Sequence, residues 1–237
     1  MEKNALKRIL NKDIKEISKQ KLNSLGIYIQ FNEDNFFEAK AMIVGPKDSL
    51  YEGGFLFFNI KFPKNYPFSP PDITYVSRNN VRIHPNIYVG HGTGGYGKVC
   101  LSILGTWSGP RWTSIMDITT ILLTVQSLLD NNPLHHEPGQ EKNVSQMNQL
   151  YNEVIEYDSI NTLFLKNFIH PPHRFDIFYD EMKKEFQKNN EFFQKKLKQK
   201  SKEKRKNITI SFYRINEIVD YGELSKKYES LLKDIKT

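Results

Sequence analysis

The 237-residue chain contains one cysteine, Cys100, in the segment GKVCLSILGTW at residues 97–107. A cysteine thiolate is a strong nucleophile and can carry an acyl group as a thioester. A cysteine inside an apolar core, in contrast, is a small packing residue with no reaction to perform. The neighbouring polar residues therefore decide which interpretation to pursue.

Asn86 is the polar residue upstream of Cys100 with the clearest chemical use, and it belongs to the tripeptide His84-Pro85-Asn86. Proline fixes the backbone beside it and favours one direction of the side-chain amide, a neutral hydrogen-bond donor. When an amine attacks a thioester an oxyanion forms, and one preorganised donor speeds such a step by about 10²- to 10³-fold. Asn86 can also simply tie the loop to its neighbours, and the two roles are compatible.

The first half of the chain predicts elements that can position this pair. Residues 5–17 form an amphipathic helical pattern with an apolar stripe of Leu6, Ile9, Leu10, Ile14 and Ile17. Aromatic and β-branched runs at residues 25–31, 36–45, 54–62 and 72–77 predict strands. Their short connections favour an antiparallel meander of four strands. The predicted fold class is α+β.

A rigid loop and a buried helix are expected around the cysteine. Residues 63–71, PKNYPFSPP, hold four prolines and can form neither strand nor helix. Ser114 and Asp117 have the spacing of a capping box that opens a helix. Its predicted buried stripe packs against the sheet and comprises Ile118, Ile121, Leu122, Val125, Leu128 and Leu129, with the end at Asn131-Asn132-Pro133.

Beyond Gly139 the apolar spacing is mainly helical, and residues 207–213, NITISFY, favour a short strand. We therefore predict a catalytic domain over residues 1–140 and a mostly helical C-terminal extension over residues 141–237.

The formal charge of +7 is concentrated in residues 195–206, KKLKQKSKEKRK, which hold eight Lys or Arg and one Glu. The rest of the chain then carries 26 basic and 26 acidic residues, so the body is neutral and nucleic acid is not the expected partner. No stretch approaches the roughly 20 apolar residues that a membrane helix needs. A single cysteine makes no internal disulfide, so we expect a reducing location, the cytoplasm or the nucleus.

Several motifs occur in a set order: YEGGFLFFNIKFPKNYPFSPP, then HPN, then GKVCLSILGTWSGPRW, then LLTVQSLLDNNP. Together they resemble the catalytic domain of ubiquitin-conjugating enzymes over roughly residues 5–140. The segments LSILGTWSGPRW and NNPLHHEPGQE resemble in particular the large Use1-like class with a C-terminal extension.

The resemblance implies that Cys100 receives ubiquitin or a ubiquitin-like protein as a thioester and passes it to a lysine of a protein substrate. Asn86 takes the position that stabilises the oxyanion or holds the active-site loop. The donor is already activated, so the chemistry needs no cofactor and no catalytic histidine beside the thiol. The lysine must lose a proton, and Glu137 is the first candidate to assist, with His136 second. Glu137 can instead serve only to cap or solvate its turn.

The same resemblance implies protein partners. Lys7, Arg8 and Lys12 match positions that meet the activating enzyme, although an amphipathic helix also carries such residues for solvation alone. Phe68 matches the aromatic that meets RING-type ligases. The family's Ser-Pro-Ala after the tryptophan is replaced by residues 113–115, Thr-Ser-Ile, which alters the second half of that surface.

One departure from the family pattern lies between Asn86 and Cys100. They are 14 positions apart (100 minus 86), six more than the common spacing of eight, and the extra residues fall within VGHGTGGY at residues 89–96. This glycine-rich insertion costs little entropy and can act as a flap over the thioester. His91 within it lacks a second ligand at suitable spacing, so no metal site is expected.

Three other functions compete with this hypothesis. A non-catalytic ubiquitin-binding scaffold of the same fold would lack the cysteine. A cysteine hydrolase needs a histidine base, for which His84, His135 and His136 are available, but no helix opens on Cys100. A nucleic-acid binder would depend on residues 195–206 alone. The conjugating-enzyme hypothesis requires a reachable sulfur close to the Asn86 amide.

Overall fold

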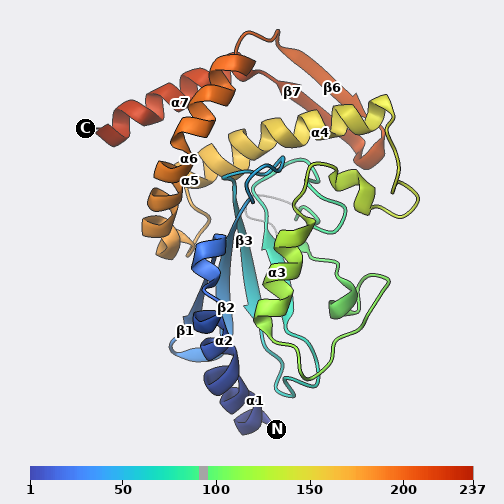
Figure 1. Ribbon diagram of the computed structural model, residues 1–237, viewed down its shortest axis with the longest axis vertical. Coiled ribbons are helices and arrows are strands. Elements are labelled where there is room, and N and C mark those ends of the chain that lie inside the picture. The colour runs from blue at the N-terminus through green and yellow to red at the C-terminus, as the bar shows by residue number, and fades with distance from the viewer. Residues whose placement is uncertain (91–95, 237) are drawn as a thin grey trace.

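The structure, a computed structural model, describes residues 1–90 and 96–236 (Figure 1). The helices are α1 Glu2–Arg8, α2 Ile14–Lys19, α3 Ile118–Leu128, α4 Gln146–Asp158, α5 Asn167–Ile169, α6 Tyr179–Lys200 and α7 Tyr221–Lys236. The strands are β1 Ile27–Asn32, β2 Asn35–Val44, β3 Phe55–Lys61, β4 Asp72–Val76, β5 Tyr96–Lys98, β6 Lys206–Ile210 and β7 Ile215–Val219. The predicted α+β fold is confirmed.

The N-terminal helix is present, with π-helical hydrogen bonding over Ile9–Asp13 between α1 and α2. Its fully buried positions are Ala5, Ile9 and Asp13, which recur every fourth residue. Leu10 lies beside this line and is 38% exposed, so the predicted stripe is wrong there. The buried line instead includes a carboxylate, which the apolar pattern could not reveal.

The main sheet has the order β1-β2-β3-β4-β5 and every neighbouring pair is antiparallel. The predicted four-stranded meander is confirmed as β1 to β4. The fifth strand was not predicted, because it is three residues long and contains Gly97, and neither feature gives a strand signal. This short strand leads directly to Cys100.

Helix α3 begins later than the capping-box prediction. Asp117, not Ser114, is the N-cap, and its carboxylate accepts from the backbone N–H groups of Thr119 and Thr120 at 3.1 and 3.3 Å. Asp117 has the extended backbone of an N-cap residue, so the helix starts at Ile118. It ends at Leu128, before the predicted stop, and lies against one face of the sheet (Figure 1).

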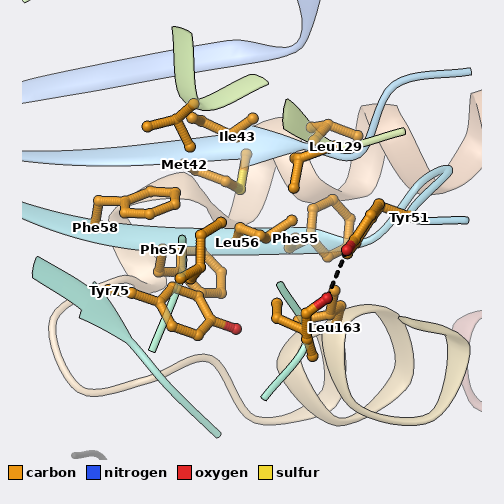
Figure 2. Packing of buried hydrophobic residues seen from close by; sticks show 14 of the residues in the cluster. Met42, Ile43, Tyr51, Phe55, Leu56, Phe57, Phe58, Tyr75, Leu129 and Leu163 are labelled. Atoms are coloured by element: carbon orange, nitrogen blue, oxygen red, sulfur yellow. Dashed lines mark hydrogen bonds between the residues drawn. The ribbon is translucent and has the colours of Figure 1, made fainter. Parts of the chain in front are cut away.

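Strand β3 is buried on both faces: Phe55, Leu56, Phe57 and Phe58 all have an exposed fraction of 0% (Figure 2). Side chains alternate between the two faces of a strand, so neighbouring residues need different covers. The ring of Phe55 lies 5.9 Å from that of Phe164, and Phe57 lies 5.0 Å from Phe175. The C-terminal extension therefore covers the face opposite α3, which we call the outer face.

The extension is mostly helical, as predicted, and its predicted strand is β6. The partner strand β7 was not predicted. The extension shares one hydrophobic cluster with the sheet, and the division at residue 140 remains a prediction. None of the described helices is both long and apolar enough to cross a membrane.

Candidate active site

Cys100 is held by a short ladder to the segment that contains Asn86. The backbone N–H of Tyr88 donates to the carbonyl of Lys98 at 2.9 Å, and the N–H of Cys100 donates to the carbonyl of Asn86 at 2.8 Å. Ile87 and Val99 form the antiparallel bridge between these two bonds. The structure thus brings together the two residues that the sequence singled out.

Asn86 fastens this ladder with its side chain. Its Nδ2 donates to the carbonyl oxygen of Cys100 at 2.8 Å, and its backbone N–H donates to Nδ1 of His84 at 3.0 Å. Its Oδ1 is buried and makes no hydrogen bond within the described part of the chain. The amide therefore holds the loop here, and its action on an oxyanion remains a prediction.

Gly97 is required by the same ladder. A Cβ at this position would lie 1.6 Å from the carbonyl oxygen of Tyr88, far closer than non-bonded atoms can approach. A glycine lets the two backbones approach closely. The glycine before the thiol is therefore a packing requirement of the active-site segment.

The sulfur-bearing residue is more enclosed than expected, because Cys100 is only 3% exposed. A groove of about 380 Å³ reaches its neighbour Val99 without being lined by Cys100 itself, and its other lining residues include Asp72, Leu104, Thr106 and the proline loop at residues 70–71. We call this the proline-side groove. The conjugating-enzyme hypothesis requires a reachable sulfur, and in this conformation Cys100 is nearly closed to solvent.

His84 is a structural residue of the site. Burial, with a smaller contribution from His136, lowers its pKa to about 3, so the ring is neutral at physiological pH. Its Nδ1 accepts the Asn86 N–H, so the ring proton resides on Nε2. With that lone pair in use, His84 cannot be the base of a cysteine hydrolase.

The two candidates for lysine activation both contact other side chains. His136 Nε2 lies 2.9 Å from Oδ2 of Asp130, and Glu137 accepts a 2.5 Å hydrogen bond from Tyr213 of the extension. Burial alone would raise the pKa of Asp130, but the hydrogen bond with His136 helps to lower it overall. His135 bonds the Asn143 carbonyl at 2.9 Å. The proposed roles of His136 and Glu137 remain predictions.

Arg82 is a site-supporting residue that sequence reasoning missed. Its guanidinium lies 3.6 Å from the ring centre of Tyr88 and 4.3 Å from that of Tyr213, and it donates to the carbonyl of Pro85. This cation–π clamp connects the extension to the segment of Asn86. No local pattern could have shown it, because the two rings are 125 positions apart in the sequence (213 minus 88).

The three basic residues of the first helix differ in their availability. Lys7 is exposed. Arg8 donates to the Met116 carbonyl at 2.7 Å and lies 3.6 Å from Asp13, and Lys12 donates to the Ile115 carbonyl at 3.0 Å. Arg8 and Lys12 therefore join the helix to the segment before α3, and contact with an activating enzyme stays a prediction for all three.

Phe68 is 77% exposed at the tip of the proline loop, as a partner-binding residue should be. Trp112 donates from its indole to the Pro67 carbonyl at 2.7 Å and so fixes the loop to the segment that follows. Ile115 in that segment is 78% exposed. An apolar surface remains here although the family's Ser-Pro-Ala is absent.

The insertion at 89–96 is described only in part, and His91 lies outside the described residues. Across residues 1–90 and 96–236, no group of three or more His, Cys, Asp or Glu side chains is arranged to hold a metal ion.

Similarity to known proteins agrees with this geometry. The family model for ubiquitin-conjugating enzymes matches residues 9–158. The chain is 40% identical over 139 residues to human ubiquitin-conjugating enzyme E2 Z, covering 57% of this chain and 37% of the relative. For the Xenopus tropicalis E2 Z the values are 38% over 138 residues, 57% and 42%. For Arabidopsis thaliana ubiquitin-conjugating enzyme E2 14 they are 33% over 154 residues, 60% and 86%.

The chain spans less than half the length of the E2 Z relatives. The matched region contains the whole ladder between Asn86 and Cys100. On the extent of the family match, this chain belongs to the ubiquitin-conjugating enzyme family.

Proposed function

We propose that the protein accepts ubiquitin or a ubiquitin-like protein from an activating enzyme as a thioester on Cys100 and transfers it to a lysine of a protein substrate. The observation that carries the proposal is the double link between Asn86 and Cys100, which fixes an amide beside the only thiol. Family membership supports the same chemistry.

The reaction is two acyl transfers. The Cys100 thiolate attacks the carbonyl carbon of the activating enzyme's thioester, a new C–S bond forms, and the activating enzyme's thiolate leaves. A neutral lysine amine then attacks the same carbon, a C–N bond forms, and the Cys100 sulfur leaves. The amine's proton passes to a base, for which Glu137 and His136 are the candidates.

Access to the sulfur is the step that this conformation does not provide. A residue that is 3% exposed cannot meet the carboxyl end of another protein unless its neighbours move. We infer that charging begins with an opening beside the proline-side groove, on the flank formed by Leu104 and Thr106. Free Cys100 should accordingly react slowly with a small alkylating reagent.

Partner surfaces follow from exposure. Lys7 is free for an activating enzyme, with Arg8 and Lys12 beside it, and Phe68 with Ile115 offers an apolar surface to a RING-type ligase. We also propose a cytoplasmic or nuclear location and membership of the Use1-like class.

A charging assay tests the proposal. The protein is mixed with activating enzymes, ATP and ubiquitin or its relatives, and a conjugate that a reducing agent removes is expected. Cys100→Ser should give a reductant-resistant oxyester, and Cys100→Ala should give nothing. A non-catalytic scaffold would bind ubiquitin without forming any conjugate, and charging of the alanine variant would refute the assignment of Cys100.

Asn86→Ala separates the two steps. Charging should persist, while discharge to lysine should slow by about 10²- to 10³-fold because the amide is lost. Glu137→Gln and His136→Asn should slow discharge at neutral pH if either side chain accepts the amine's proton. Equal loss of charging and discharge in the Asn86 variant would show that the amide only maintains the fold.

A further inference from the structure

Part of the outer sheet face carries polar residues that lie opposite one another on neighbouring strands. Lys40 pairs with Asn59, Asn59 with Thr74, and Thr74 with Lys98. Residues directly opposite each other in a sheet share a face. The next pair on this face of β4 and β5 is Val76 with Tyr96. Beyond this pair the extension covers the sheet.

The segment at residues 171–175, which follows α5, forms a second wall opposite these rows. Between the two walls lies a groove of about 620 Å³, lined by Lys40, Asn59, Val76, Arg78, Tyr96 and residues 171–175. We call it the basic groove, because Lys40, Arg78 and Arg174 line it together with His173. Among the described residues that line it, none carries a carboxylate.

Two cations of the basic groove, Lys40 and Arg78, have neutral partners. Lys40 donates to the Asn59 side chain at 3.0 Å and lies 4.8 Å from the ring centre of Phe175, and Arg78 donates to the His170 carbonyl. Burial, and then the charge of Arg174, lowers the pKa of Lys40, while Glu38 on the same strand opposes this. The groove therefore concentrates positive charge that a bound anion would neutralise.

Arg174 is presented to the groove by an unusual backbone. Its φ of 64° lies in the left-handed region, which costs a non-glycine residue roughly 1 kcal/mol. The side chain is exposed, while Phe175 directly after it and Pro172 two residues before it are buried. The buried neighbours hold the strained residue in place.

The basic groove continues toward the thiol. Tyr96, which is 68% exposed, lines both this groove and the proline-side groove, which passes Lys98 and Val99. Cys100 is four residues after Tyr96, or about 13 Å along an extended chain at about 3.3 Å per residue. An extended peptide that starts in the basic groove thus needs about four residues to reach Cys100.

We propose that the basic groove binds an acidic segment of the acceptor protein and so places a lysine about four residues away at Cys100. The inference rests on the proposed transfer from Cys100. The groove is walled by Tyr96 and Phe175 and its Lys40 is half-buried, so it suits an extended peptide better than a nucleic acid, whose phosphates favour an open track such as residues 195–206.

Two fluorescent peptides test the proposal. Each has one lysine and four Gly/Ser spacer residues, followed by four glutamates in the probe and four glutamines in the control. Anisotropy with the uncharged protein measures binding, and single-turnover discharge of the preformed thioester measures transfer. The glutamate peptide should bind and accept ubiquitin about tenfold better than the control.

Arg174→Glu should abolish that tenfold preference and leave discharge to free lysine unchanged. Lys195→Glu, a matched charge reversal at an exposed residue of α6, should keep the preference. The proposal would be overturned if both variants lost the preference for the glutamate peptide equally, or if the Arg174 variant kept it. It would also be overturned if a single-stranded RNA bound more tightly than the peptide and its binding depended on Arg174. Binding is measured without charging, so failure of the transfer chemistry would be recognised separately.

Discussion

The active-site ladder and the basic groove lie toward opposite ends of β5. They differ in whether their polar and charged groups are already paired. At the ladder, the carbonyl and the side-chain NH2 of Asn86 both hydrogen-bond the backbone of Cys100, although Asn86 Oδ1 has no partner within the described residues. In the groove, Lys40 and Arg174 crowd together with no lining carboxylate. The backbone hydrogen bonds of the ladder are formed without a partner protein, whereas the positive charge of the groove would be neutralised by one.

The two regions are also held by different forces. Hydrogen bonds and the Arg82 clamp hold the ladder, while aromatic packing through Phe175 and Phe57 holds the wall of the groove. A change in the aromatic core should therefore affect the groove before the ladder. Substitutions in each region test this contrast.

Phe164→Ala should lower the free energy of unfolding by about 3–5 kcal/mol, because it leaves a cavity in the core of the extension. The Phe164 ring is stacked on Phe193 with centres 3.9 Å apart and on Phe186 with centres 5.5 Å apart. Urea denaturation measures the loss. Phe68→Ala at an exposed position should change stability by less than about 0.5 kcal/mol. If both variants unfold alike, the extension does not share the sheet's core.

His84 should make the ladder sensitive to acid. Its folded pKa is about 3, against about 6.5 when unfolded, so between these values the unfolded state binds the extra proton. This contribution is fully present above pH 6.5 and is lost as pH falls, at ~1.4 kcal/mol per pH unit.

The variant His84→Asn keeps an acceptor for the Asn86 N–H but cannot titrate. Between pH 7 and pH 5, denaturation curves should show the wild type losing ~2 kcal/mol more than this variant. Parallel losses in the two proteins would mean that His84 binds its proton at the same pH in the folded and unfolded states.

Tyr213→Ala should cost about 1–2 kcal/mol, because it removes one face of the Arg82 clamp together with the hydrogen bond to Glu137. Discharge from Cys100 should slow a fewfold, since Arg82 also bonds the Pro85 carbonyl. Tyr213→Phe keeps the ring and should retain most of the activity. If the discharge rate of the alanine variant were unchanged, the extension would not support the active-site ladder.

Arg174→Gly should have the smallest effect on stability, a gain of up to about 1 kcal/mol, because glycine adopts a positive φ without strain. It should nevertheless abolish the preference for the glutamate peptide. Arg214 has a φ of 53° outside the groove, so Arg214→Gly relieves comparable strain and should leave peptide binding intact. Loss of binding in both variants would trace the effect to the backbone.

The fold could be predicted from sequence wherever buried residues form an apolar run or recur at helical spacing. Strands β1 to β4 lie in aromatic and β-branched runs and are present close to the predicted bounds, and α3, which has a helical apolar pattern, is present but shorter at both ends. Strand β5 and the buried Asp13 were not predicted. Three residues that include a glycine carry no strand pattern, and a carboxylate in a line of buried residues goes against the apolar pattern of a helix.

The site was predictable only in its motif residues. Asn86 and Cys100 were identified because a nucleophile and a proline-braced amide are unusual together. Arg82, Tyr213 and Arg174 were missed, because their roles depend on contacts between segments far apart in the chain. The enclosure of Cys100 was not foreseen either, since exposure is a property of the surrounding surface.

The double burial of β3 has a consequence for how this sequence can vary. Phe55 and Phe57 face the extension while Leu56 and Phe58 face the other way, and all four are fully enclosed. A saturation library should therefore find almost no polar replacement accepted at any of these four positions. On β1, Gln30 and Asn32 should accept many, since neither is buried.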